Sequence, residues 1–191
     1  MAKAMKWTAV ICFLLTVVFA GIFLAGVPWA LSIAITFGTC FYHFAMRLLA
    51  GHILNGIMGN HADYTKPWYQ QLPFEKRLYK VLKVKKWKGS LPTYDPSLFD
   101  SQLHSWDEIA QAMCQAEVVH EIIVVLSFLP LLAAIPFGSF FVFLITSLLA
   151  ALYDLSFVIM QRYNRPRVLK FLRISQSSIT DRRKTDAQME P

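Results

Sequence analysis

Two long runs without a charged residue constrain this chain more than any other feature of its sequence. Residues 7–27 form an apolar run of 21 residues, and residues 122–153 form a second run of 32. In a helix that rises about 1.5 Å per residue, about 20 apolar residues cross the hydrocarbon core of a bilayer. Because 55% of the 191 residues are hydrophobic, the composition also argues against an ordinary soluble domain. The sequence therefore predicts an integral membrane protein.

Turn signals divide the apolar regions into four spans. The tetrapeptide GVPW separates the first run from a second apolar segment, and the hexapeptide AIPFGS interrupts the long run. Proline and glycine at such positions favour turns. We therefore predict an all-α integral membrane protein whose four transmembrane helices form two antiparallel hairpins. The four spans are expected at about residues 7–27, 29–50, 113–135 and 137–161.

The basic residues predict how the helices cross the membrane. Of the 19 lysines and arginines, only Arg47 lies inside a span, and neither hairpin turn contains one. The others precede the first span, lie in the central segment between the hairpins, or occur from Arg162 onward. Cytoplasmic loops carry an excess of lysine and arginine. We therefore expect a multi-pass protein of the plasma membrane with both termini and the central segment in the cytoplasm.

Between the hairpins, residues 73–88 combine aromatic and aliphatic side chains with seven basic residues. Apolar side chains among lysines are typical of a helix in the headgroup region, so we predict a cytoplasmic interfacial amphipathic helix at about residues 73–88. Ser105 and Glu108 form a capping-box pattern that predicts a helix start. Residues 1–174 are expected to form a single membrane domain. The polar, charge-rich residues 175–191 are expected to form a disordered cytoplasmic tail.

The strongest catalytic candidate lies at the start of the third span. Glu117 and His120 are three residues apart and Glu121 follows, so the three side chains share one face of a helix. A histidine held by a carboxylate can take the proton of a hydroxyl at neutral pH. This pattern predicts His120 as a general base that Glu117 assists. The alternative is a solvated helix end with polar residues at the interface, but an intramembrane position favours the functional interpretation.

Further polar residues are predicted on the same side of the membrane. His43 and Arg47 lie one turn apart near the cytoplasmic end of the second span, and Asp154 lies in the fourth. Because a charged side chain in lipid is costly, Asp154 is expected to face the bundle. It can pair with Arg47 or orient His120, and the sequence leaves both open. The predicted substrate-binding group here comprises His43, Arg47, Glu121 and Asp154.

The same histidines and carboxylates raise the question of a metal site. Imidazole and carboxylate groups are common metal ligands. However, no two histidines have the H-x-x-x-H spacing of zinc peptidases or the histidine boxes of di-iron membrane enzymes. The three cysteines form neither a zinc nor a disulfide pattern. We therefore expect no bound metal and no cofactor.

The heptapeptide QRYNRPR, residues 161–167, follows the fourth span directly. Arginines after a span usually serve as anchors that satisfy the positive-inside rule. Their density indicates a second role, because Pro166 is expected to end or kink the helix and guanidinium groups bind phosphate oxygens well. We predict that the motif binds a phosphorylated acyl donor or a lipid phosphate, with KVKKWKG at residues 83–89 as the opposite wall. The predicted binding residues are Arg162, Tyr163, Asn164, Arg165 and Arg167, together with Lys86, Trp87 and Lys88.

Three stretches in the same order resemble one known family. VKKWKGSLP at residues 84–92, AEVVHE at residues 116–121 and QRYNRPRVLKFLR at residues 161–173 are similar to the glycosyl-4,4'-diaponeurosporenoate acyltransferases of staphyloxanthin-type carotenoid biosynthesis. The resemblance extends over about residues 74–173. Members of that family esterify a sugar hydroxyl of a membrane glycolipid with a long acyl chain. The resemblance thus implies an acyltransferase of a bacterial plasma membrane.

Together these features predict a membrane acyltransferase. It would move a fatty acyl group from an acyl thioester, such as acyl-CoA, to a hydroxyl of a membrane lipid or glycolipid, for example a glycosylated carotenoid. His120 is the predicted base, Glu117 its helper, and the QRYNRPR arginines the ligands of the donor phosphates. The basic charge indicates anionic headgroups or a phosphorylated substrate rather than nucleic acid. Two alternatives stay open: a non-catalytic lipid-binding or assembly subunit, and another lipid-modifying enzyme, including a metal-dependent one.

Overall fold

The computed structural model describes residues 2–189, which are built from helices and connecting turns without a strand. The α-helices in this part of the chain are α1 (Ala2–Leu24), α2 (Ala30–Met58), α3 (Glu75–Val81), α4 (Val84–Trp87), α5 (Trp106–Leu126), α6 (Ala134–Phe137) and α7 (Phe140–Met189). Short 3-10 helices occur at Pro67–Tyr69, Lys88–Ser90, Pro96–Phe99 and Leu129–Ala133.

Four segments are long and apolar enough to cross a membrane. They are Lys3–Leu24, Ala30–Met58, Trp106–Phe137 and Phe140–Ser178. Many of their outward side chains are large and apolar, as is suited to a surface in contact with lipid. The prediction of an all-helical chain with four helices of this kind is confirmed.

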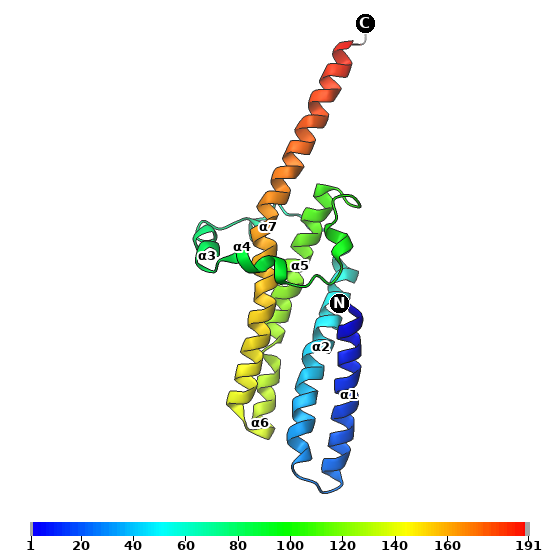
Figure 1. Cartoon of the computed structure of the whole chain (residues 1–191), viewed down its shortest axis with the longest axis vertical. Coiled ribbons are helices and arrows are strands. Elements are labelled where there is room, and N and C mark those ends of the chain that lie inside the picture. Colours follow the sequence, from blue (N-terminus) through cyan, green and yellow to red (C-terminus); the bar gives the residue numbers. More distant parts are fainter. Residues whose placement is uncertain (1, 190–191) are drawn as a thin grey trace.

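The long helices pack in pairs. α1 and α2 lie along each other (Figure 1) and are joined at Gly26, whose φ of 95° is one that L side chains rarely adopt. α5 and α7 also lie along each other, and their connection runs through Leu129–Ala133, α6 and Gly138. Gly138 has a φ of 71°, so glycine is favoured at this turn as well. Each connection therefore contains a glycine with a positive φ.

The two helix pairs meet where α2 contacts α5. Met46 and Ala50 of α2 and Ile123 of α5 form a buried apolar cluster. Nearby, the hydroxyl of Tyr42 donates a 2.8 Å hydrogen bond to the carbonyl of Leu126 at the end of α5. This contact brings α2 beside the α5–α7 pair, so polar side chains from three helices can meet inside the bundle.

The start of α5 agrees with the capping box. The hydroxyl of Ser105 accepts a hydrogen bond from the backbone N–H of Glu108, and the Glu108 carboxylate accepts one from the backbone N–H of Ser105. The helix therefore starts at Trp106, ahead of the apolar part of the third span. Glu117 and His120 thus lie in the middle of a helix and not at a frayed end.

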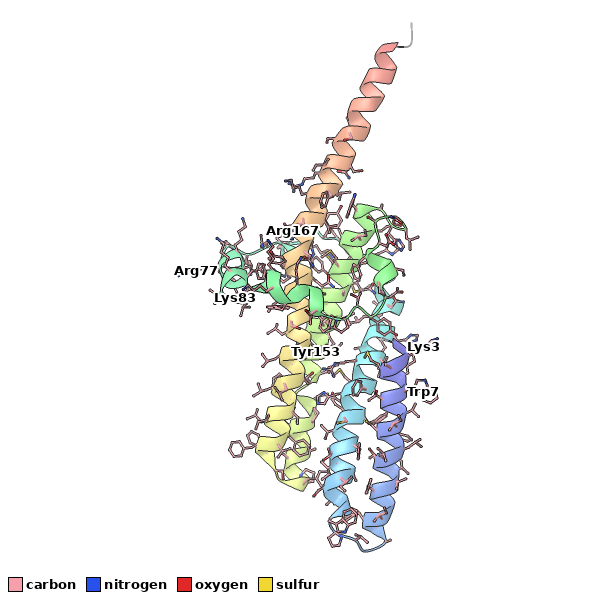
Figure 2. All side chains as sticks on the ribbon, in the orientation of Figure 1. Lys3, Trp7, Arg77, Lys83, Tyr153 and Arg167 are labelled. Atoms are coloured by element: carbon pink, nitrogen blue, oxygen red, sulfur yellow. The ribbon has the colours of Figure 1, made fainter. Side chains whose placement is uncertain are left out.

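The central segment differs from its prediction. In place of one helix over residues 73–88, it contains α3 and α4, separated at Lys83, whose φ of 52° interrupts the helical geometry. The indole of Trp87 donates a 2.9 Å hydrogen bond to the carbonyl of Leu82, which satisfies a backbone group at this break. α3 and α4 lie across the side of α7 (Figure 1), and Arg77 and Lys83 project away from it (Figure 2).

α7 also differs from expectation, because Pro166 lies inside it and does not end it. The helix continues to Met189, so residues 175–189, expected as a disordered tail, are helical and extend beyond the bundle (Figure 1). No glycine or proline occurs between Pro166 and Met189, and extending an existing helix is easier than starting one. The remaining expected tail residues, 190 and 191, lie outside the described part.

Candidate functional site

Two clusters of charged side chains lie against the facing sides of α5 and α7. We call the first the Asp154 cluster; it comprises His120 of α5, Asp154 of α7 and Arg47 of α2. We call the second the Glu117 cluster; it comprises Glu117 of α5, Arg162 and Arg165 of α7, and Glu75 at the start of α3. Residues three or four apart share one face of a helix, so Arg162 and Arg165 lie on the same face of α7 and both reach Glu117.

In the Asp154 cluster, the carboxylate links two other helices to α7. Asp154 is 1% exposed, and its Oδ1 lies 3.0 Å from Nδ1 of His120. Its Oδ2 accepts a hydrogen bond from Nη2 of Arg47. Arg47 also donates to the carbonyls of His43, at 2.8 Å, and Ala150, at 3.4 Å. Of the two contacts that the sequence leaves open for Asp154, the structure has both.

His120 has the geometry of a base that a carboxylate orients. When Nδ1 donates to Asp154, Nε2 keeps a lone pair, and no group in the described residues binds Nε2. The ring stacks on Phe157 with 4.5 Å between the centroids, which fixes the ring plane. The side chain remains 23% exposed. The imidazole is thus held on one side and accessible on the other.

His43 lies beside this cluster on α2. Both of its ring nitrogens are buried and have no hydrogen-bond partner within residues 2–189. The ring packs edge-on against Tyr42, with 5.5 Å between the centroids. Because a buried polar atom rarely lacks a partner, His43 is suited to bind a hydroxyl that enters the bundle. Its role in substrate binding stays a prediction.

In the second cluster, Glu117 contacts two arginines and not His120. Its carboxylate is fully buried; Oε1 accepts from Nη1 of Arg162 at 2.6 Å, and Oε2 accepts from Nη2 of Arg165. The sequence predicts Glu117 as the helper of His120, but Asp154 has that position in the structure. Shared helical spacing puts Glu117 and His120 on one face, and the arginines of α7 then attract the carboxylate of Glu117 away from the histidine.

The same two arginines hold the segment that precedes α3. Arg162 donates to Oε1 of Glu75 at 2.6 and 2.9 Å. Three backbone carbonyls also accept from the arginines: those of Trp68 and Gln70 from Arg162, each at 2.9 Å, and that of Tyr69 from Arg165, at 2.7 Å. Most of the guanidinium donors therefore have partners inside the protein. The predicted binding of donor phosphates by these arginines stays a prediction.

Glu75 is a residue that sequence reasoning missed. It is buried, and besides Arg162 it accepts a 2.6 Å hydrogen bond from the hydroxyl of Tyr79. Burial, together with this carboxylate, raises the pKa of the Tyr79 hydroxyl above its ordinary value. Within residues 73–88, Glu75 is the single acidic residue beside seven basic residues. That contrast is the sequence signal that could have identified it.

The outer side of the QRYNRPR motif contacts Lys88. The ammonium of Lys88 donates a 2.5 Å hydrogen bond to Oδ1 of Asn164 and lies 4.9 Å from the centroid of the Tyr163 ring. Arg167 lies over the same ring at 5.0 Å and donates to the Tyr163 hydroxyl at 3.1 Å. Burial and the nearby Arg167 lower the pKa of Lys88. The central segment and the motif therefore face each other here.

Other predicted site residues lie apart from these contacts. Glu121 accepts a 3.0 Å hydrogen bond from the indole of Trp68. Lys86 is exposed, and Trp87 binds the backbone beside the break between α3 and α4. Over residues 2–189, no group of three or more histidine, cysteine, aspartate or glutamate side chains is arranged to hold a metal ion.

Comparison with known proteins relates both clusters to one family. A family model described as glycosyl-4,4'-diaponeurosporenoate acyltransferase matches residues 65–174, which contain every residue of the two clusters except Arg47. No curated protein and no solved structure matches the chain. The family match covers more than half of the 191 residues and confirms the resemblance of the three sequence stretches. The chain therefore belongs to the glycosyl-4,4'-diaponeurosporenoate acyltransferase family, an acyltransferase family of carotenoid biosynthesis.

Proposed function

We propose that the protein transfers a fatty acyl group from an acyl thioester to a hydroxyl of a membrane lipid or glycolipid, such as a glycosylated carotenoid. His120 is the general base. The observation that carries the proposal is the 3.0 Å contact between Nδ1 of His120 and the buried Asp154, whose second oxygen pairs with Arg47. Membership of the family supports the reaction class.

The proposed reaction has two proton transfers, the first to His120 and the second from it. Nε2 of His120 takes the proton of the acceptor hydroxyl while the hydroxyl oxygen attacks the thioester carbonyl. The C–O ester bond forms, the C–S bond breaks, and the imidazolium returns the proton to the departing thiolate. Asp154 stabilises the imidazolium, and Arg47 holds Asp154 in place. These steps require neither a metal nor a cofactor.

We also propose that the helix pairs α1–α2 and α5–α7 cross the bacterial plasma membrane as two antiparallel hairpins. Both termini and the central segment are then cytoplasmic. The charge distribution supports this arrangement, because the connections at residues 25–29 and 127–139 contain no basic residue. α3 and α4 would lie at the cytoplasmic surface with their exposed apolar side chains in the headgroup region. The Glu117 cluster would lie at this boundary, with His120 one turn deeper.

Replacing His120 with alanine tests the catalytic role. Loss of a general base typically reduces the rate by about 10²–10⁴-fold, so membranes with His120→Ala should accumulate very little acylated lipid. His52→Ala is a matched control, because His52 is an exposed histidine of α2 outside both clusters. Mass spectrometry of membrane lipids at equal protein abundance measures the product. Wild-type amounts of acylated lipid with His120→Ala would reject the assignment and favour a non-catalytic lipid-binding or assembly subunit.

A further inference from the structure

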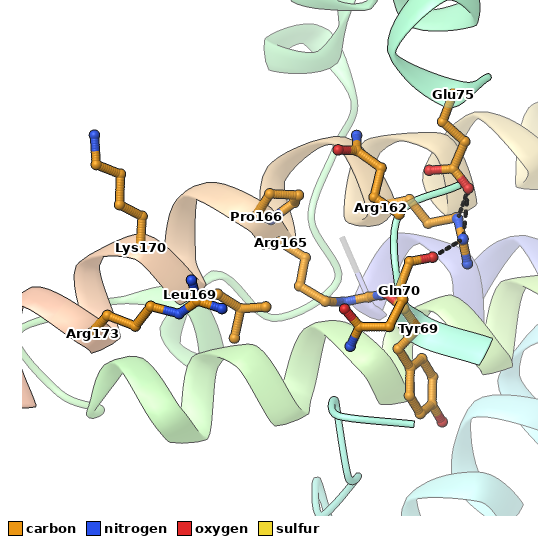
Figure 3. A pocket seen from close by; sticks show the side chains of 10 residues that line it. Tyr69, Gln70, Glu75, Arg162, Arg165, Pro166, Leu169, Lys170 and Arg173 are labelled. Carbon is orange, nitrogen blue, oxygen red and sulfur yellow. Dashed lines mark hydrogen bonds and ion pairs between the residues drawn. The ribbon is translucent and has the colours of Figure 1, made fainter. Parts of the chain in front are cut away.

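A cavity of about 270 Å³ lies beside the Glu117 cluster (Figure 3). It lies between the segment that follows Pro67–Tyr69 and the part of α7 around and beyond Pro166, and it contains neither His120 nor Asp154. It is therefore separate from the proposed place of chemistry. Its basic lining residues are Arg162, Arg165, Lys170 and Arg173.

The charges around this cavity do not cancel. The two arginines of the Glu117 cluster are balanced by its two glutamates, with which they are paired. Lys170 and Arg173 are exposed and form no ion pair and no side-chain hydrogen bond with the part of the chain that the structure describes. Two positive charges thus remain at the cavity, which suits a ligand with phosphate groups.

Arg165 supplies an additional donor at this cavity. Its side chain is 2% exposed, and its terminal nitrogens bind Glu117 and the carbonyl of Tyr69. Its Nε–H is buried and has no acceptor among the described residues. Buried donors rarely lack a partner, and a guanidinium N–H is well suited to a phosphate oxygen. Figure 3 shows Arg173 extending back along α7 toward Leu169, so a second guanidinium approaches from the C-terminal side.

We propose that this cavity binds the phosphate groups of the acyl donor, in the form of a soluble coenzyme A thioester. Lys170 and Arg173 provide the free charges, and Nε of Arg165 provides a buried donor. The inference rests on the proposed acyl transfer and adds the place where the donor is held. The volume is below the roughly 300–1,000 Å³ of pockets that enclose a drug-sized ligand. It therefore suits the phosphates and not the whole donor.

The position of the cavity along α7 suits a donor with a long arm. Arg165 and Arg173 follow Asp154 by 11 and 19 residues, which at about 1.5 Å per residue places them about 16 and 28 Å along the helix axis. In a coenzyme A thioester, the pantetheine arm separates the reacting carbonyl from the phosphates. Such a donor can place its thioester at His120 while its phosphates stay at the cytoplasmic end of the bundle.

Binding of free coenzyme A tests the cavity without requiring turnover. The full-length protein is placed in nanodiscs of zwitterionic phosphatidylcholine, and calorimetric titration compares wild type with Lys170→Gln/Arg173→Gln. The matched control is Lys76→Gln/Arg77→Gln, which removes the same charge from exposed residues of α3 that do not line the cavity. We expect the affinity to fall by about tenfold or more in the cavity variant, because two charged hydrogen-bond donors are lost. The control should bind as wild type does.

Equal affinity of wild type and the cavity variant for coenzyme A would overturn the proposal, as would the absence of binding to wild type. Nanodiscs that contain phosphatidylglycerol separate the two phosphate sources. If wild type loses its affinity for coenzyme A there, the cavity holds a lipid phosphate, and the donor assignment is overturned.

Acyl transfer, measured separately, distinguishes this proposal from the proposed function. Binding through Lys170 and Arg173 without any acyl transfer would contradict the proposed function and support the cavity as a phosphate site. If Lys170→Gln/Arg173→Gln transfers the acyl group normally and with the wild-type KM for the donor, the proposed phosphate site is contradicted and the proposed function is not.

Discussion

Asp154→Asn tests how the base is oriented, because asparagine keeps the shape of the side chain and removes its charge. In the structure one oxygen of Asp154 accepts from Arg47 and the other contacts Nδ1 of His120. Asparagine has a single side-chain acceptor atom. If its oxygen stays on Arg47, its amide nitrogen donates to Nδ1, and His120 then carries its proton on Nε2. The variant therefore stabilises the tautomer that cannot act as the base.

The size of this effect follows from the chemistry of the tautomer. A general base contributes about 10²–10⁴-fold to the rate. Stabilising the tautomer with the proton on Nε2 should remove most of that contribution. We expect kcat to fall about 10³-fold, which corresponds to about 4 kcal/mol of transition-state stabilisation. The KM values should change little, because Asp154 touches His120 and Arg47 and acts on the reaction through the histidine.

Glu117→Gln should lower the stability of the protein and leave kcat nearly unchanged. Glu117 pairs with Arg162 and Arg165 and does not contact His120. Its replacement leaves two guanidinium groups facing a neutral amide, and breaking a buried pair costs about 3–5 kcal/mol. Glu75 still balances Arg162, so a loss of about 3 kcal/mol is expected. Thermal stability should fall, while kcat of the folded fraction changes far less than in Asp154→Asn.

The two variants are compared at equal amounts of folded protein. Initial rates of acyl transfer in nanodiscs, over donor and acceptor series, give kcat and KM, and thermal unfolding in detergent gives stability. Two outcomes would refute the reasoning. One is a wild-type kcat for Asp154→Asn. The other is a Glu117→Gln protein that unfolds at the wild-type temperature and loses kcat to the same extent as Asp154→Asn.

The remaining predictions concern topology and the Glu75 contact. A cysteine at Gly89, in a protein whose native cysteines are replaced, should react with a membrane-impermeant maleimide only after the cells are opened; labelling of intact cells would contradict the cytoplasmic central segment. Because burial and Glu75 raise the pKa of Tyr79 in the folded state, its contribution to stability is present below the unfolded pKa of about 10 and decreases as the pH rises above it. Tyr79→Phe should lack this part of the decrease when unfolding temperature is measured against pH, and parallel curves for the two proteins would contradict the argument.

The spanning helices could be predicted from sequence because they depend on local properties. The length of an apolar run and the turn residues that end it act within a few positions of each other, as Gly26 and Gly138 show. The contacts of Glu117 are of a different kind. Its partner Arg162 lies 45 residues away, and Arg162 and Glu75 are separated by 87. Helical spacing identifies which residues share a face with Glu117, but it does not identify the residues on the opposite helix.

Two local differences also have a physical reason. The break at Lys83 requires a positive φ that lysine does not favour. The residue type at this position therefore does not predict a break in the helix. The turn is supported instead by the tertiary surroundings and by the indole of Trp87. Pro166 is tolerated inside α7, where Arg162 and Arg165 attach the preceding turn to α5. In both cases side-chain contacts override the intrinsic preference of one residue.

The ion pairs of Glu117 with Arg162 and Arg165 join the segment before α3 to α5, the helix that carries His120. Glu117 is less than one helical turn from His120 on α5. The arginines that it holds also grip the chain at Trp68, Tyr69 and Gln70. We therefore expect this segment and the imidazole of His120 to keep a fixed spacing for as long as these bonds hold.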